Sequence, residues 1–116
     1  KSTLNRNMPF TVHNDAPVVP PDMIRLLWST TNRKTRSGKV LGEEQKISTY
    51  SALEAMTINA AYQHFEDDIK GSIEVGKLAD LVVLSEDPLS IDTKNLLEVN
   101  VVATFSRGVE VFNSAK

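Results

Sequence analysis

The sequence contains no cysteine, which excludes a disulfide framework, a thiolate metal site and a cysteine nucleophile. It has no apolar run near the ~20 residues that a membrane span needs, and no secretory signal peptide is visible. Two common catalytic signatures are also missing, the G-x-S-x-G nucleophile elbow and a glycine-rich phosphate loop. These absences remove several enzyme classes, and they leave the compartment open with the cytoplasm favoured.

Charge of neither sign is in strong excess. The 116 residues carry a formal net charge of −2, and the sequence pI is near 5.7. A nucleic-acid or membrane-surface partner would require a basic patch, so neither partner is predicted. The length fits one small domain, and a composition of 41% hydrophobic and 24% charged residues is typical of a globular protein.

A polar cluster at the end of an apolar stretch is the one candidate site. Residues 10–13 are rich in β-formers and predict a short strand, which ends at His13, Asn14 and Asp15 shortly before a proline. In a regular strand, the side chains of His13 and Asp15 would face the same side, and both residue types can bind zinc. Two ligands do not make a site, because a catalytic zinc usually takes three protein ligands. The alternative is a surface Asx-turn at Asn14 or Asp15.

A first amphipathic helix is predicted after this cluster. Residues 22–33 place apolar side chains near 3.6-residue spacing, after a Pro-Pro-Asp start that suits a first helical turn. The polar and basic run at residues 32–38 is interpreted as a solvated helix end with Gly38 as the stop signal. A phosphate-binding patch is the alternative for this run.

A second, longer helix is predicted over residues 47–65. Ser48 or Thr49 can cap it, and Ser51 with Glu54 also fits the capping-box pattern. Its alanines allow close packing on a neighbouring element. His64 lies near its end, where an imidazole favours the helix dipole, and it is interpreted as structural.

The pattern becomes strand-like around residue 70. Residues 79–84 predict a buried strand and residues 99–105 a second strand, and residues 109–112 predict a return strand that closes a hairpin after a tight turn. Asp80 is interpreted as a strand-edge or turn carboxylate. The fold class predicted for the chain is therefore α+β.

Three stretches resemble the amidohydrolase superfamily. GSIEVGKLADLVVLSEDP, residues 71–88, resembles the segment in which these enzymes leave a metal-binding (β/α)8 barrel and re-enter a small β-sandwich. HNDAPV, residues 13–18, resembles the last barrel strand, and is closest to the subgroup of large YtcJ-like hydrolases (amidohydrolase family 3). GKVLGEEQKISTYSALEAMTINAAY, residues 38–62, resembles the connecting segment and the helix that follows. The resemblance covers nearly the whole chain, in order.

This resemblance implies two parts and a role for Asp15. Residues 1–70 would be the last strand and helices of the barrel, and residues 71–116 the C-terminal part of the composite β-sandwich domain. Asp15 matches the aspartate at the C-terminal end of the eighth strand, at the face where the active sites of such barrels lie. In the family this aspartate touches the catalytic metal and takes a proton from the attacking water. No ligand role carries over to His13, and Asn14 replaces the common serine.

The reaction implied is metal-assisted hydrolysis of an amide or related C–N bond, with one or two divalent ions, expected to be zinc. A complete barrel needs ~250 residues, and this chain carries one barrel strand of eight. We therefore expect a C-terminal fragment of a hydrolase that acts on small amide-type, non-peptide substrates. By itself the fragment would be inactive and bind no metal.

A fragment would leave much of the apolar face of the second helix without its natural partners, so we expect the chain to pair with itself as a homo-oligomer or with other chain segments. One alternative is a non-catalytic regulatory or binding module derived from an amidohydrolase tail. Another is an unrelated small α+β domain.

Overall fold

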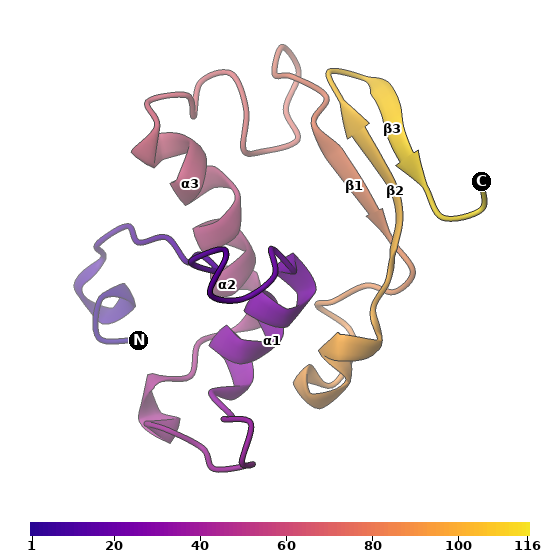
Figure 1. Cartoon of the computed structure of the whole chain (residues 1–116). Helices are drawn as coiled ribbons and strands as arrows, with labels where there is room; N and C mark the ends of the chain where they lie inside the picture. Colours follow the sequence, from indigo (N-terminus) through magenta and orange to yellow (C-terminus); the bar gives the residue numbers. More distant parts are fainter.

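The chain forms a helical part followed by a small three-stranded antiparallel sheet, which stands to one side of the helices (Figure 1). The computed structural model describes all residues, 1–116. The α-helices are α1 (Met23–Asn32), α2 (Thr49–Met56) and α3 (Ile58–Gln63), and the strands are β1 (Leu81–Leu84), β2 (Val101–Ser106) and β3 (Val109–Asn113). Three short 3-10 helices complete the fold: η1 (Leu4–Arg6), η2 (Glu43–Gln45) and η3 (Thr93–Glu98). None of the helices has both the length and the apolar character that a membrane crossing requires.

The strand expected over residues 10–13 does not form, so this prediction is wrong. The single sheet has the order β1-β2-β3, and no strand lies beside residues 10–13. A β-strand exists only where its backbone groups bond to a neighbouring strand. The β-forming side chains therefore produce an irregular segment that depends on other donors.

Helix α1 begins where the sequence predicts. The carboxylate of Asp22 accepts a hydrogen bond from the N–H of Arg25 over 2.9 Å, which is an N-cap. The helix ends at Arg33, which has a left-handed conformation (φ 52) and donates its N–H to the Ser29 carbonyl. The prediction that Gly38 stops this helix is wrong, because Arg33 closes it earlier.

The basic residues after α1 form a tight turn of their own. The N–H of Thr35 donates to the carbonyl of Lys39 over 2.8 Å, and an isolated antiparallel bridge joins Lys34 to Val40. Gly38 has φ 86 within this turn, a conformation that glycine adopts without strain. The run is therefore solvated, as expected, but it is a turn and not a helix end.

The single helix predicted over residues 47–65 is interrupted. Ser48 caps α2 by accepting the N–H of Ser51 over 3.1 Å, so the first of the two capping predictions is confirmed. Thr57 breaks the helix with φ −121 and ψ −91, and its hydroxyl donates to the Leu53 carbonyl over 2.7 Å. A β-branched residue whose side chain bonds to the preceding turn competes with regular helix geometry, which explains the break.

The hydrophobic core is small and lies among the helices. Leu27, Ile47, Ala52 and Leu96 form it, and Leu96 comes from η3, which packs against α1. Ala52 and Ala55 of α2 are fully buried, whereas Tyr50 of α2 and Tyr62 of α3 are exposed, so the helical part covers its apolar side chains only in part. Exposed apolar side chains also occur on the sheet, at Val82, Val83, Val109, Val111 and Phe112.

The sheet confirms the positions of the strands and the hairpin expected from the sequence, but the expected burial of the strand at residues 79–84 is wrong, because Leu81, Val82 and Val83 of β1 are exposed. β1 pairs with β2 through Val83 and Ala103, and β2 pairs with β3 through Ser106 and Val109. The two-residue loop between β2 and β3 has positive φ at both positions, 50 at Arg107 and 79 at Gly108. This is the backbone of a type I′ hairpin, which matches the twist of the flanking strands.

Candidate functional site

Asp15 lies in a tight surface turn. Its backbone has φ 54, its N–H donates to Nδ1 of His13 over 3.0 Å, and its carbonyl accepts the N–H of Val18 over 2.9 Å. Aspartate tolerates this left-handed conformation better than most residues. The side chain is exposed, and no hydrogen bond or ion pair within the chain occupies its carboxylate. The carboxylate is therefore free to contact a ligand.

His13 and Asp15 do not have the same-side arrangement that a regular strand would give them. The left-handed backbone at Asp15 removes the alternation on which the same-side expectation depends. The turn is not an Asx-turn, so that alternative is also wrong. In an Asx-turn the side chain of Asn14 or Asp15 would accept a backbone N–H, whereas here the His13 imidazole accepts the N–H of Asp15. Asn14 instead donates its side-chain amide to Sδ of Met23 over 3.4 Å. His13 and Asn14 thus hold the turn that carries Asp15.

Two polar residues of α3 form hydrogen bonds with the segment that leads into this turn. Nδ2 of Asn59 donates to the backbone carbonyl of Phe10 over 3.1 Å, and the hydroxyl of Thr11 donates to Oε1 of Gln63 over 2.8 Å. These contacts join residues 10 and 11 to a helix about 50 positions later in the sequence. The sequence patterns did not single out Asn59 and Gln63; their spacing of four residues, on one helical face, was the available signal.

A cleft of about 450 Å³ lies between the helices and the start of β1. Its twelve lining residues include Met56, Ala60 and His64 on the helical side and Leu81 and Val82 on the strand side. His64 caps the C-terminus of α3, and its backbone N–H donates to the Ala61 carbonyl over 3.0 Å. The position of His64 at a helix end is confirmed.

Asp80, which also lines the cleft, has a structural contact. Its Oδ1 accepts the backbone N–H of Arg107 over 2.8 Å. The interpretation of Asp80 as a strand-edge carboxylate is confirmed.

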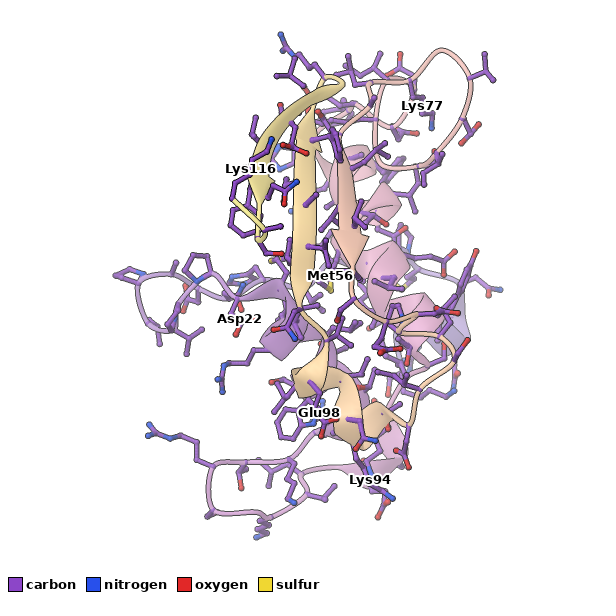
Figure 2. All side chains as sticks on the ribbon, turned by 90° about the vertical axis from the view of Figure 1, so that its right-hand side faces the viewer. Asp22, Met56, Lys77, Lys94, Glu98 and Lys116 are labelled. Atoms are coloured by element: carbon purple, nitrogen blue, oxygen red, sulfur yellow. The ribbon has the colours of Figure 1, made fainter.

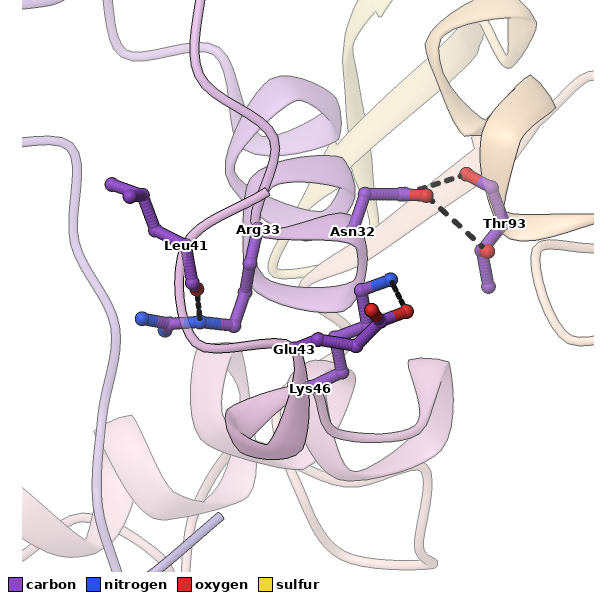
Figure 3. A network of polar contacts seen from close by, with 6 residues as sticks. All are labelled: Asn32, Arg33, Leu41, Glu43, Lys46 and Thr93. Atoms are coloured by element: carbon purple, nitrogen blue, oxygen red, sulfur yellow. Dashed lines mark hydrogen bonds and ion pairs between the residues drawn. The ribbon is translucent and has the colours of Figure 1, made fainter. Parts of the chain in front are cut away.

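Side chains of the basic turn after α1 donate hydrogen bonds to uncharged backbone carbonyls. Nε of Arg33 donates to the Leu41 carbonyl over 2.6 Å (Figure 3). The hydroxyl of Thr35 donates to the Lys39 carbonyl over 3.0 Å. These bonds stabilise the turn. The phosphate-binding alternative for this run stays a prediction.

Lys77 organises the loop before β1 (Figure 2). Its Nζ donates to the Asp67 carbonyl and to Oγ of Ser72, both over 2.6 Å, and pairs with Oε1 of Glu74 at 3.2 Å. The side chain is only 12% exposed, so the ammonium depends on these oxygens for solvation. Hydrogen bonds from Ser72 and then Lys77 hold the pKa of Glu74 below its usual value. The lysine of the GKLAD stretch therefore has a structural role, which is to hold this loop together.

The residues of this chain alone do not fit a catalytic metal centre. No three His, Asp or Glu side chains gather closely enough to hold an ion. Since a catalytic zinc usually takes three protein ligands, Asp15 can supply at most one of them. Residues from outside this chain would have to supply the others.

Comparison with known proteins gives consistent matches. Residues 1–112 match the model of a family described as the amidohydrolase family. The chain is 31% identical over 109 residues to the N-substituted formamide deformylase of Arthrobacter pascens, which covers 94% of this chain and 20% of that protein. It is 26% identical over 118 residues to YtcJ of Bacillus subtilis (strain 168), whose name describes it as an amidohydrolase, covering 99% of this chain and 22% of that protein.

A solved structure agrees with these sequence matches. It is an amidohydrolase from Thermotoga maritima, with a TM-score of 0.71 and 26% sequence identity, covering 95% of this chain and 24% of the other. The chain thus spans about a fifth to a quarter of the length of these proteins.

Proposed function

The chain belongs to the amidohydrolase family, and we propose that it forms the C-terminal part of a metal-dependent hydrolase that cleaves non-peptide, amide-type C–N bonds. One observation carries this proposal, the match of residues 1–112 to the family in a single continuous stretch. The relative from Arthrobacter pascens supports the bond type, because its name describes the deformylation of N-substituted formamides. Small N-substituted formamides are therefore the first substrates to test.

In this proposal residues 1–70 end a (β/α)8 barrel and residues 71–116 belong to a β-sandwich. The three antiparallel strands support the second assignment, since their exposed apolar side chains require further cover. The unpaired segment at residues 10–13 supports the first, since a barrel would supply the strand that it lacks here. The same uncovered surface leads us to propose that the isolated chain associates with itself.

Asp15 is the proposed catalytic residue of this chain and a proposed metal ligand. Its carboxylate is exposed and unoccupied by other groups, which a general base or a metal ligand requires. When bound, a divalent ion, proposed to be zinc, would lower the pKa of a coordinated water. Since this chain lacks the remaining ligands, we propose that the isolated chain is inactive and holds no metal.

The proposal is tested by assaying the whole protein that contains this chain beside the isolated 116 residues. Hydrolysis of N-substituted formamides and bound metal would be measured for both, before and after treatment with a chelator. The proposal expects chelator-sensitive hydrolysis by the whole protein and none by the isolated chain. A folded whole protein that binds no metal and hydrolyses no amide would contradict it and would favour a regulatory or binding module instead.

A further inference from the structure

The segment that carries Asp15 lacks the backbone partners of a strand, so other groups must fix it. Its Phe10 carbonyl would be unsatisfied in a partly buried position without a donor. The Asn59 amide supplies that donor over 3.1 Å. In Figure 1 the N-terminal segment crosses the α2–α3 helices before it enters α1.

Asn59 holds the segment more firmly than Gln63 does. Both side chains lie on one face of α3, four residues apart, and they meet the consecutive residues Phe10 and Thr11. The bond from Asn59 is partly buried, whereas the bond to Gln63 is exposed. A hydrogen bond shielded from water is stronger and costlier to leave unmade, so Asn59 is the main anchor.

The anchor lies close to the carboxylate along the chain. Phe10 packs against the core cluster with its side chain while its carbonyl receives Asn59, so both sides of this residue are fixed. Residues 11–14 then lead to Asp15, whose N–H is held by His13. The intervening residues have no strand neighbour and make only exposed side-chain hydrogen bonds to other elements, from Thr11 to Gln63 and from Asn14 to Met23. A shift of Phe10 would therefore move the turn at Asp15.

We infer that Asn59 is a positioning residue for Asp15, through the side-chain hydrogen bond that fixes residue 10. This inference rests on the proposed function, because it requires Asp15 to act in the reaction. Asn59 touches no reacting atom in this account, and its effect passes through the backbone. Displacement of a catalytic group by about 1 Å can cost roughly a hundredfold in rate.

The test compares Asn59→Ala and Asn59→Asp with Asn32→Ala in the whole protein. Asn32 is the matched control, because its Nδ2 donates to the Thr93 carbonyl over 2.9 Å and is also partly buried (Figure 3). It joins α1 to η3, away from the Asp15 turn. The aspartate variant keeps the size of Asn59 but, when ionised, cannot donate to Phe10.

We expect both Asn59 variants to lower kcat for a formamide substrate by about tenfold to a hundredfold with little change in KM. Asn59→Ala and Asn32→Ala should lower thermal stability by similar amounts, since each removes a partly buried hydrogen bond. Asn32→Ala should leave kcat unchanged. Hydrogen exchange at the amides of Asp15 and Val18 should become faster in both Asn59 variants and stay unchanged in Asn32→Ala.

Equal kcat in Asn59→Ala and Asn32→Ala, with unchanged exchange at Asp15, would overturn the inference while leaving the proposed function intact. A wild-type protein without hydrolase activity would instead refute the proposed function, and the inference would fall with it.

Discussion

The carboxylate of Asp80 accepts a hydrogen bond from the backbone N–H of Arg107 over 2.8 Å, although 27 positions separate the two residues. The neighbouring Ala79 carbonyl accepts the N–H of Gly108 over 2.9 Å. The residues before β1 therefore hold the turn between β2 and β3. In the GKLAD stretch, Lys77 holds the preceding loop through its bonds to Asp67, Ser72 and Glu74, and Asp80 holds the hairpin through its bond to Arg107.

Replacing Asp80 should loosen that hairpin. Asp80→Ala removes the acceptor of the Arg107 N–H, and we expect a loss of about 1 kcal/mol in the free energy of unfolding, since the pair is exposed. Chemical denaturation of the chain measures it. Asp68→Ala is the control, because Asp68 is also exposed and its carboxylate has no partner within the chain. Equal stability of the two variants would show that the Asp80 contact contributes nothing.

Gly71 should tolerate no side chain. A Cβ there would lie 2.7 Å from Cβ of Ala61 and 3.0 Å from Cα of Ile58, and the backbone has φ +95. Gly76 has the same φ, but a Cβ added there would meet no atom within 4 Å, so Gly76→Ala isolates the backbone strain. We expect about 1–2 kcal/mol for Gly76→Ala and about 1–3 kcal/mol more for Gly71→Ala, measured by denaturant unfolding. Similar losses in both variants would argue against the close approach at Gly71.

Acid should weaken the loop that contains Glu74. Hydrogen bonds from Ser72 and Lys77 lower the pKa of this carboxyl below its usual 4.5 in the folded chain. The stabilisation is therefore complete above pH 4.5 and is lost as the pH falls through the lower, folded pKa. Glu74→Gln should flatten the decline of Tm on the acid side, and Ser72→Ala should do so in part. An unchanged acid limb in Glu74→Gln would contradict this assignment.

The isolated chain should associate through its sheet. Val109 and Val111 of β3 are 65% and 61% exposed, on an edge strand that contains one charged residue, Glu110. Edge strands with few charges pair readily with other chains. Val111→Lys should shift sedimentation toward the monomer, whereas Val18→Lys, at a loop position that is also exposed, should not. A monodisperse wild-type monomer at the same concentration would contradict the prediction.

Local sequence signals predicted the elements whose hydrogen bonds close within a few residues. The helix start at Asp22, the Ser48 cap and the Arg107-Gly108 turn each depend on neighbours in sequence, and the structure confirms all three. The strand at residues 10–13 failed because a strand depends on a partner that lies elsewhere. The sequence pattern did not predict the break at Thr57, because the residues around it have good helical periodicity.

The candidate site was only partly accessible from sequence. The resemblance to the amidohydrolases drew attention to Asp15, and Pro17, two residues later, indicated a turn there. The contacts that hold this turn, from Asn59 to Phe10 and from Thr11 to Gln63, cross about 50 positions of sequence. No local pattern encodes such long-range pairs, so they required the structure.

The most direct test of the account is the hydrolysis rate of Asp15→Asn in the whole protein. Asp68→Asn is the matched control, since it makes the same change at another exposed carboxylate. The account predicts that Asp15→Asn stays folded and loses at least about a hundredfold in kcat for an N-substituted formamide, because the base is removed. Asp68→Asn should retain the wild-type rate. Full activity in a folded Asp15→Asn variant would contradict the assignment of Asp15 as the catalytic carboxylate.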